Sequence, residues 1–287
     1  KCDRTSYGGH ITGFYDNSGE EAFVEKAAGQ TPTPVAAAVT VPAPAPAAPA
    51  PTIPAAPTAP PPVPGQVTAF NTMQQAVVRN MNASLSVPVF RVSYTITTDA
   101  LDALYKQIKS KGVTMTGLLS KAVAATLVKH PIINASYTDA GIQYNGSINV
   151  AVAVAMPDGG LITPVLRGAD QMDIYSLSRT WKDLVARSRS KQLQPEEYTT
   201  GTFTLSNLGM FGVDSFDAIL PPGTGSILAI GGAKPTVVAD ANGMIGVKKQ
   251  MTVNITCDHR IIYGADGAAF LKDLADLIEN NPQSLTL

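Results

Sequence analysis

The chain has 287 residues, and its 21 lysines and arginines nearly balance 22 aspartates and glutamates, for a formal net charge of -1. This balance gives no electrostatic reason to expect a nucleic acid or a membrane surface as the main partner, and no apolar run is as long as a membrane-spanning helix requires. Cys2 and Cys257 form no CxxC pattern, so we expect neither a metal site nor a disulfide framework, and the simplest compartment is a reducing one. The chain begins without methionine or a targeting pattern, and we expect it to be part of a longer precursor.

Composition divides the chain into three segments. Residues 1–30 are polar and contain several glycines, whereas residues 31–65 are almost entirely Ala, Pro, Val and Thr without a charge. Proline at this density cannot donate backbone hydrogen bonds, so residues 31–65 are expected to be a disordered, extended linker. Either a passive spacer or a swinging arm fits that composition. Residues 66–287 are long enough for a single large α/β domain.

Apolar periodicity predicts the first elements of this domain. We expect an entry helix near residues 73–81 and a strand over 89–97. A helix that Asp99 caps should follow and end at Gly112, and Thr116 should open the next helix.

The second of these helices should end at His130, because proline follows directly. As a residue at a helix C-terminus, His130 is favoured by the helix dipole and needs no catalytic role. Asn145-Gly146 is the strongest short hairpin signal in the chain, and it predicts that residues 148–156 form the second strand of a hairpin.

The C-terminal half alternates helix and strand signals. Asp173 should cap a helix, and Asp266 should cap the last one. Asn242-Gly243 predicts another hairpin. The expected strands cover residues 202–208, 226–230 and 251–257.

Two strand ends carry candidate functional residues. Asp258, His259 and Arg260 follow a β-branched apolar strand and precede a glycine turn, which is a common place for catalytic side chains. A histidine in a structural ion-pair network would show the same pattern. Ser206 lies at the glycine-flanked end of the strand over 202–208, where it could also simply bond to the backbone.

These two motifs resemble the acyltransferase core of the 2-oxoacid dehydrogenase complexes. The resemblance runs from about Val67 to Leu287, and its motifs, residues 202–209 and 254–267, are about fifty residues apart in the expected order. The best fit is to the acetyl-transferring E2 components of pyruvate dehydrogenase complexes. Most family members carry Asp or Asn where Tyr263 stands, and in this respect the chain resembles the plastid branch.

The resemblance implies a fold and a setting for the chain. The fold would be an α/β (α+β) sandwich like that of chloramphenicol acetyltransferase, with a mixed sheet and flanking helices. Residues 1–30 would be a remnant of the peripheral subunit-binding region, and the lipoyl group would be carried on a domain upstream of this chain. The expected reaction is transfer of an acetyl group between the dihydrolipoyl arm and coenzyme A.

Acyl transfer between thiols requires a base for the incoming thiol and a donor for the tetrahedral oxyanion. The resemblance implies that His259 and Ser206 have these roles, with Tyr263 as a third catalytic candidate. Free thiols have pKa values about two units above that of imidazole, so a histidine can accept the proton as sulfur attacks. The two substrates would enter opposite ends of a channel between subunits. The residues expected along this channel are Leu161, Thr163, Asn207 and Gly209.

The neighbours of His259 are expected to support it. Arginine stays protonated and cannot act as a base, so Asp258 and Arg260 are interpreted as an orienting ion pair. Cys257 alternates with Met251, Val253 and Ile255 and should be a packed core residue. An acyltransferase with a cysteine nucleophile would instead make Cys257 essential, and Cys257→Ala tests that alternative.

The resemblance also implies partners. The chain would assemble with further copies of itself, as trimers in a large cage. It would also bind pyruvate dehydrogenase (E1) and dihydrolipoamide dehydrogenase (E3). The expected compartment is the plastid stroma or, alternatively, the mitochondrial matrix. A non-catalytic core scaffold is the main alternative, and retention of His259 and Ser206 argues against it. A transferase for succinyl or branched acyl groups is another. A different acyltransferase of the same broad fold, such as the plant HxxxD acyltransferases or chloramphenicol acetyltransferase, is a further alternative. Those enzymes carry a carboxylate where Tyr263 stands, and an Ala/Pro tether has no purpose in them.

Overall fold

The computed structural model describes residues 64–156, 160–239 and 242–287. The expectations for residues 1–30, and for all but the last two residues of the 31–65 linker, lie outside these ranges. Residues Gly65–Leu287 form one compact unit. None of the helices in the described ranges combines the length and apolar character needed to cross a bilayer.

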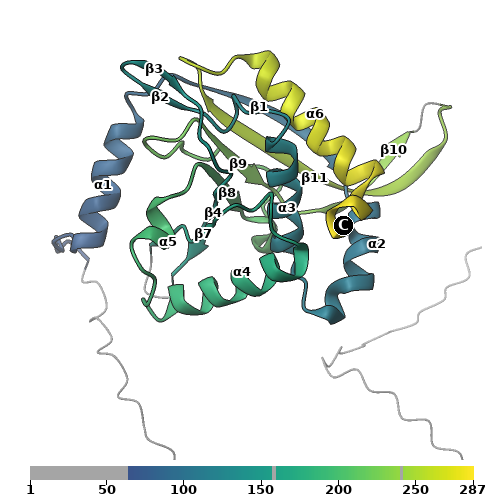
Figure 1. Cartoon of the computed structure of the whole chain (residues 1–287), viewed down its shortest axis with the longest axis horizontal. Helices are drawn as coiled ribbons and strands as arrows, with labels where there is room; N and C mark the ends of the chain where they lie inside the picture. The colour runs from purple at the N-terminus through teal and green to yellow at the C-terminus, as the bar shows by residue number, and fades with distance from the viewer. Residues whose placement is uncertain (1–63, 157–159, 240–241) are drawn as a thin grey trace, which may run out of the picture. The chain divides into compact units, whose positions relative to one another are not determined.

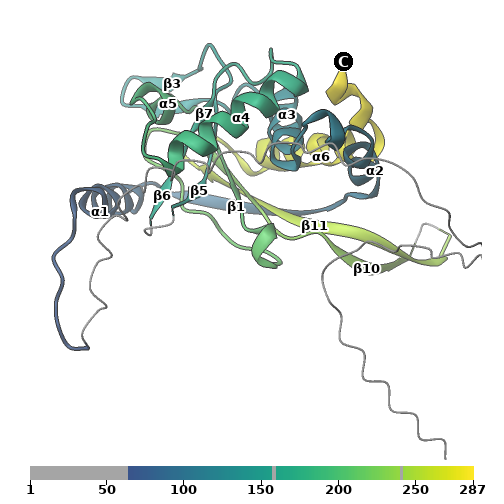
Figure 2. The same ribbon diagram turned by 90° about the horizontal axis from the view of Figure 1, so that it is seen from below.

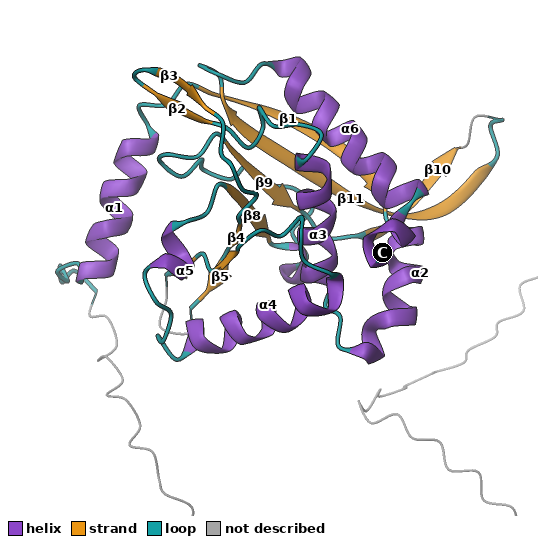
Figure 3. Ribbon diagram, viewed as in Figure 1, coloured by secondary structure: helices purple, strands orange, loops and turns teal. Residues whose placement is uncertain are grey.

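A mixed sheet forms the centre of this unit (Figures 1 and 3). In the described part of the chain it has seven strands, in the order β1-β11-β9-β8-β4-β7, with β10 paired to the N-terminal part of β11, Ile245–Gln250. Strands β4, β8 and β9 run parallel, and the other pairs are antiparallel. The expected mixed α/β sheet with flanking helices is therefore confirmed. The strands are β1 (Val89–Thr97), β4 (Val150–Val152), β7 (Val165–Leu166), β8 (Phe203–Asn207), β9 (Ser226–Ile230), β10 (Lys234–Ala239) and β11 (Ile245–Asp258).

Two short ribbons stand apart from this sheet. One pairs β2 (Ser136–Thr138) with β3 (Gly141–Gln143), and the other pairs β5 (Val154–Ala155) with β6 (Leu161–Ile162). The hairpin expected at Asn242-Gly243 is confirmed by the pairing of β10 with β11.

Helices α2, α3, α4 and α6 cover one face of the sheet (Figure 2). Successive side chains of a strand point to opposite faces, so Met251, Val253, Ile255 and Cys257 of β11 enter the layer under these helices. There they pack with Phe270 and Leu274 of α6 in the main core. The helices are α1 (Thr72–Ser84), α2 (Asp99–Ile108), α3 (Met115–Leu127), α4 (Ile174–Arg189), α5 (Glu196–Thr199) and α6 (Gly264–Asn280), with 3-10 turns η1 (Lys109–Lys111), η2 (Gly209–Phe211) and η3 (Pro282–Thr286).

Three expected helix starts were wrong by one to three residues. Thr98, not Asp99, is the N-cap of α2, and Thr114, not Thr116, caps α3 by accepting a 3.0 Å hydrogen bond from the amide of Gly117. In α6 the N-cap is Tyr263, whose backbone amide donates to the side chain of Asp266 at 2.9 Å. An acidic side chain in the first helical turn also satisfies free amides, so composition alone does not distinguish it from a cap.

The predicted end of α3 was also misplaced. The helix ends at Leu127, so His130 lies beyond it, where its Nε2 is 2.9 Å from Oδ2 of Asp273 in α6. His130 therefore joins the segment that follows α3 to α6 and is not the last residue of a helix.

The hairpin expected at Asn145-Gly146 does not form. Strand β3 pairs with β2, and β4 lies between β8 and β7 in the main sheet. The Asn145 side chain instead donates to the carbonyl oxygen of Asn134 at 2.6 Å. The expected strand over 148–156 is also divided into β4 and β5, which join different sheets. Long-range parallel pairing with β8 has overridden a local turn signal.

Candidate active site

A tight turn at the end of β11 presents His259. The amide of Asp258 donates to the carbonyl oxygen of Gly225 at 2.9 Å, and the amide of His259 donates to that of Pro88 at 2.8 Å. The backbone on both sides of the imidazole is thus tied to the segments that enter β9 and β1. The His259 side chain takes no part in these bonds and is exposed.

An ion pair stabilises this turn from within. The Asp258 side chain is 3% exposed, and its Oδ1 accepts hydrogen bonds from the amide and Nε of Arg260 at 3.0 and 2.9 Å. Its Oδ2 accepts a third bond from a terminal guanidinium nitrogen at 2.6 Å. Hydrogen bonding to Asp258 raises the pKa of Arg260, which keeps the guanidinium charged. Arginine stays protonated and cannot act as a base, so we interpret the pair as fixing the turn and not as reacting.

Two aromatic rings flank the imidazole of His259. The Phe90 ring centroid is 4.5 Å away, tilted by 49°, and the Tyr263 ring meets it edge-on at 6.0 Å. Tyr263 is 62% exposed, whereas Phe90 is partly buried against the core. The imidazole is therefore supported on one side and accessible on another.

Ser206 and His259 do not meet within one chain. In the sheet register Ser206 lies opposite Ala229, which lies opposite Asn254, and His259 follows Asn254 by five residues along β11. At about 3.4 Å per residue, this offset is about 17 Å, far beyond hydrogen-bonding distance. Leu205 is fully buried among the helices, so Ser206 points to the opposite face of the sheet.

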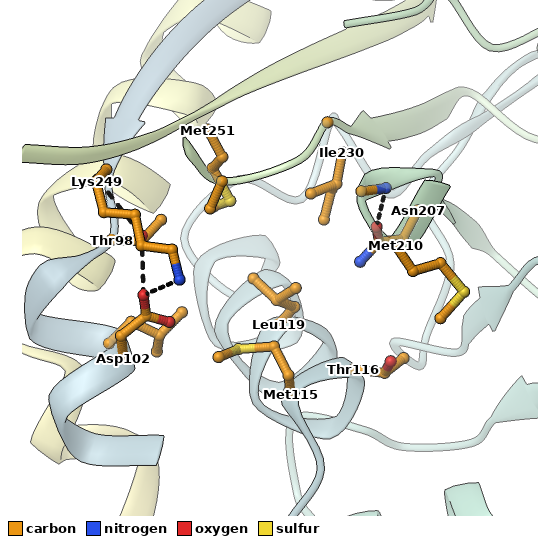
Figure 4. Close-up of a pocket in the computed structure, with 14 residues that line it drawn as sticks. Thr98, Asp102, Met115, Thr116, Leu119, Asn207, Met210, Ile230, Lys249 and Met251 are labelled. Carbon is orange, nitrogen blue, oxygen red and sulfur yellow. Dashed lines mark hydrogen bonds and ion pairs between the residues drawn. The ribbon is translucent and has the colours of Figure 1, made fainter. Parts of the chain in front are cut away.

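A cavity of about 300 Å³ lies beyond the Ser206 end of β8 (Figure 4). Asn207 and Gly209 line one end of it, where the Gly209 amide donates to the Asn207 side chain at 2.8 Å. At the other end Nζ of Lys249 is 2.7 Å from Oδ2 of Asp102. Apolar side chains lie between these ends: Met115, Leu119, Ile230 and Met251.

The four residues expected along the channel are thus divided. Asn207 and Gly209 border the cavity, whereas Leu161 and Thr163 do not line it. Leu161 is exposed on β6, in the small β5–β6 ribbon. The structure therefore gathers half of the expected channel residues around one cavity.

Gly231 allows the chain segment after Ser206 to pack closely beside this cavity. A Cβ atom at Gly231 would collide with the carbonyl oxygen of Asp214 and lie 3.0 Å from that of Thr252. We expect Gly231→Ala to displace the Asp214 segment and to lower the free energy of unfolding by about 1–3 kcal/mol. Denaturant unfolding measures this change. Gly246→Ala is the matched control, because a Cβ there meets nothing within 4 Å, and equal effects of both substitutions would contradict the packing argument.

Cys257 is a buried core residue, as its alternation with the apolar side chains of β11 predicts. Burial raises the pKa of its thiol to about 12, and its sulfur is 3.5 Å from the Ser226 hydroxyl oxygen. A thiol this hard to ionise is a poor nucleophile at neutral pH.

We therefore expect Cys257→Ala to keep kcat within about threefold of the wild-type value, because the thiolate is the reactive form of cysteine. Steady-state acyl-transfer assays check this, with thermal unfolding measured in parallel to account for the lost packing. A loss of more than about a hundredfold in a folded variant would support the cysteine-nucleophile alternative.

The sequence did not point to two residues of this site. Phe90 reaches His259 because β1 pairs with β11, and Tyr137 lies against Arg260, whose guanidinium carbon is 3.7 Å from the ring centroid. Both contacts join residues that are far apart in the sequence, and no local sequence pattern predicts them. Within the described ranges, no three His, Cys, Asp or Glu side chains group as metal ligands would.

Two curated plant proteins are similar in sequence to most of this chain. Dihydrolipoyllysine-residue acetyltransferase components 5 and 4 of the chloroplastic pyruvate dehydrogenase complex of Arabidopsis thaliana are 68% identical over 223 residues and 62% identical over 230 residues. These matches cover 77% and 79% of this chain and 48% of each relative, so the chain spans about half the length of these proteins.

Solved structures show the same fold. The cubic core of the pyruvate dehydrogenase multienzyme complex matches with a TM-score of 0.71 at 28% identity, covering 79% of this chain and 98% of that one. The Azotobacter vinelandii dihydrolipoamide acetyltransferase matches equally well at 27% identity, with the same coverage. It was studied for the catalytic roles of a serine, a histidine and an asparagine, the last two spaced by four residues, as His259 and Tyr263 are.

The family model for the catalytic domain of the 2-oxoacid dehydrogenase acyltransferases matches residues 64–287. This match covers the entire compact unit, including both strand ends that carry the candidate residues. The chain belongs to the 2-oxoacid dehydrogenase acyltransferase family.

Proposed function

We propose that this chain transfers an acetyl group between a dihydrolipoyl arm and coenzyme A, and that it forms the core of a plastid pyruvate dehydrogenase complex. The observation that carries the proposal is the turn after β11, where the buried carboxylate of Asp258, paired with Arg260, holds His259 in an exposed position. The two Arabidopsis relatives, named as chloroplastic acetyltransferase components, support the acyl group and the compartment.

In the proposed reaction His259 acts as the base. Its imidazole accepts the proton of the coenzyme A thiol as the sulfur attacks the thioester carbonyl of the acetylated arm. A new carbon–sulfur bond forms, and the carbonyl oxygen becomes an oxyanion, to which the Ser206 hydroxyl donates a hydrogen bond. When the carbonyl forms again, the bond to the dihydrolipoyl sulfur breaks, and the imidazolium returns its proton to that sulfur. Every proton and electron pair is then accounted for without a metal or a covalent enzyme intermediate.

We place this site between two chains. Within one chain the strand register separates Ser206 from His259 by about 17 Å, yet the reaction requires both at one carbonyl group. The exposed His259 of one subunit can meet Ser206 of the next in a ring with closed rotational symmetry, and a trimer is the form we propose. Such trimers would then build the larger cage, and the cubic core named for the solved structure supports this assembly.

The substrate channel then runs along the subunit boundary. The cavity beside Asn207 and Gly209 is proposed as one part of it, and exposed Leu161 with Thr163 as another. The ring of Tyr263 makes a T-shaped contact with that of His259, and Tyr263 is proposed to orient the imidazole or to contact the reacting groups. Pyruvate dehydrogenase and dihydrolipoamide dehydrogenase are proposed partners, with the lipoyl group on a domain upstream.

Assay of the protein with dihydrolipoamide and a panel of acyl-CoA thioesters tests this function. Acetyl-CoA should exceed succinyl-CoA and isobutyryl-CoA in kcat/KM by at least about tenfold, because added groups must fit the same acyl pocket. A preference for succinyl or branched acyl groups would assign a different member of the family. No turnover with any thioester, in a folded and assembled protein, would indicate the scaffold alternative.

A further inference from the structure

We propose that Tyr137, on the β2–β3 ribbon, is a positioning residue for His259. Its ring lies on the guanidinium of Arg260, and Arg260 in turn holds the carboxylate that shapes the catalytic turn. This inference rests on the acyl transfer proposed above and adds a residue from outside both sequence motifs. Tyr137 does not touch the imidazole and acts through two intermediaries.

The first link is the stacking of Tyr137 on Arg260. The guanidinium carbon is 3.7 Å from the centroid of the phenol ring, a distance at which the ring face attracts a cation. The Arg260 side chain is 33% exposed, so solvent competes for its donors. A ring against one face of the guanidinium restricts its rotation and keeps its donors directed at Asp258.

The second link is the dependence of Asp258 on Arg260. Among the described residues, all the hydrogen bonds that the Asp258 side chain accepts come from Arg260. This carboxylate is almost fully buried, and a buried charge without its partner is strongly unfavourable. If Arg260 turns away, the carboxylate must therefore either move or be hydrated by water that enters the turn.

The third link joins Asp258 to the backbone around His259. The carboxylate accepts the amide of Arg260, and the carbonyl oxygen of Asp258 accepts the amides of Ile261 and Ile262 at 3.2 and 3.0 Å. His259 is the first residue inside this turn, so the direction of its imidazole follows the position of Asp258. A small shift there misplaces the base relative to the thiol, and catalysis is sensitive to such shifts.

Tyr137 is well placed to serve as a support. Its strand is anchored at its start, where the Asn145 side chain bonds to the Asn134 carbonyl at 2.6 Å and the Ser136 hydroxyl at 3.3 Å. Tyr137 itself is 37% exposed and contributes little to the main core. Its substitution should therefore leave the fold intact, which makes the role measurable.

The test compares Tyr137→Leu with Tyr137→Phe in the assembled protein. Leucine removes the ring and phenylalanine keeps it, so we expect kcat to fall about fivefold to tenfold in the first and to stay within about twofold of wild type in the second. KM for dihydrolipoamide and acetyl-CoA should change by less than about twofold, because binding contacts are untouched. Tyr144→Leu is the matched control, since Tyr144 is an exposed tyrosine just after the same ribbon, and should keep wild-type kcat. Wild-type kcat in Tyr137→Leu, or failure of phenylalanine to restore it, would overturn the proposal.

A double-mutant cycle identifies the route of the effect. In an Arg260→Gln background Tyr137→Leu should lower kcat by less than about twofold, because the ring then has no cation to hold. Fully multiplicative losses would show that Tyr137 does not act through Arg260. Amide hydrogen exchange gives an answer independent of turnover: the amides of Arg260 and Ile262 should exchange faster in the leucine variant and not in the phenylalanine variant. A wild-type protein without transferase activity would reject the proposed function, whereas unchanged exchange in Tyr137→Leu would reject the positioning role.

Discussion

Replacement of His259 by alanine is expected to lower kcat by at least about a hundredfold, the contribution that general base catalysis typically makes. The structure predicts that this loss will occur without unfolding. The backbone amide of His259, not its side chain, bonds to Pro88, and the Asp258–Arg260 pair holds the turn independently of the imidazole. Removal of the exposed ring takes away its contacts with the rings of Phe90 and Tyr263 and leaves these backbone and ion-pair interactions in place.

His130→Ala is the matched control for this prediction. His130 pairs with Asp273 and packs edge-on against Phe270, so its loss should lower stability while kcat stays within about threefold of the wild-type value. Steady-state kinetics, circular dichroism and the size of the assembly should be measured for both variants. A folded, assembled His259→Ala protein with more than about a tenth of wild-type kcat would exclude His259 as the base.

The sequence predicted the central strands well, for a physical reason. Strands β1, β9 and β11 carry apolar residues with a period of two or as a continuous buried run, and β1 and β9 match their expected ranges. Strand β11 contains the expected range of 251–257 but begins six residues earlier, at Ile245, where it pairs with β10. A one-residue slip would move the core face of β11 to the other side of the sheet, so burial specifies this pattern strongly.

Predictions of turns and helix starts from short sequence patterns were less accurate, because the same pattern is compatible with more than one structure. Asn145-Gly146 has the composition of a hairpin turn, yet β4 is paired parallel to β8, a strand more than fifty residues away. No short-range rule anticipates that pairing. Helix starts failed for a related reason, because Asp99 and Asp266 stabilise the first turn as acidic residues do and yet are not the caps.

The candidate site likewise combines residues that are adjacent in the sequence with residues that only the fold brings together. Asp258, His259 and Arg260 are adjacent in sequence, so the sequence alone is enough to propose that they act together. Phe90 and Tyr137 join them only through the fold, as does the cavity between Asn207 and Lys249. The separation of Ser206 from His259 also depends on strand register, which the sequence did not provide.

Co-assembly of two inactive chains should restore activity, and this is the second large effect expected. Ser206→Ala alone should lose about 2.7–4 kcal/mol of transition-state stabilisation, a fall of about a hundredfold to a thousandfold in kcat. With Ser206 about 17 Å along the sheet from its own His259, a chain that lacks one residue can supply the other to its neighbour. If Ser206→Ala and His259→Ala chains are expressed equally and mix at random, about one interface in four pairs an intact histidine with an intact serine.

Activity in that mixture should therefore recover to about a quarter of the wild-type value, against almost none for either variant alone. Wild-type chains mixed equally with chains carrying both substitutions provide the control. An interfacial site again predicts about a quarter, because both neighbours must be wild type, whereas a site within one chain predicts about a half in the control and no recovery in the first mixture. Differential tags on the two chains verify that mixed assemblies have formed. An interfacial site thus predicts about a quarter of wild-type activity in both mixtures, whereas a site within one chain predicts none in the first mixture and about a half in the control. The two measurements together decide whether the base and the oxyanion donor come from neighbouring subunits.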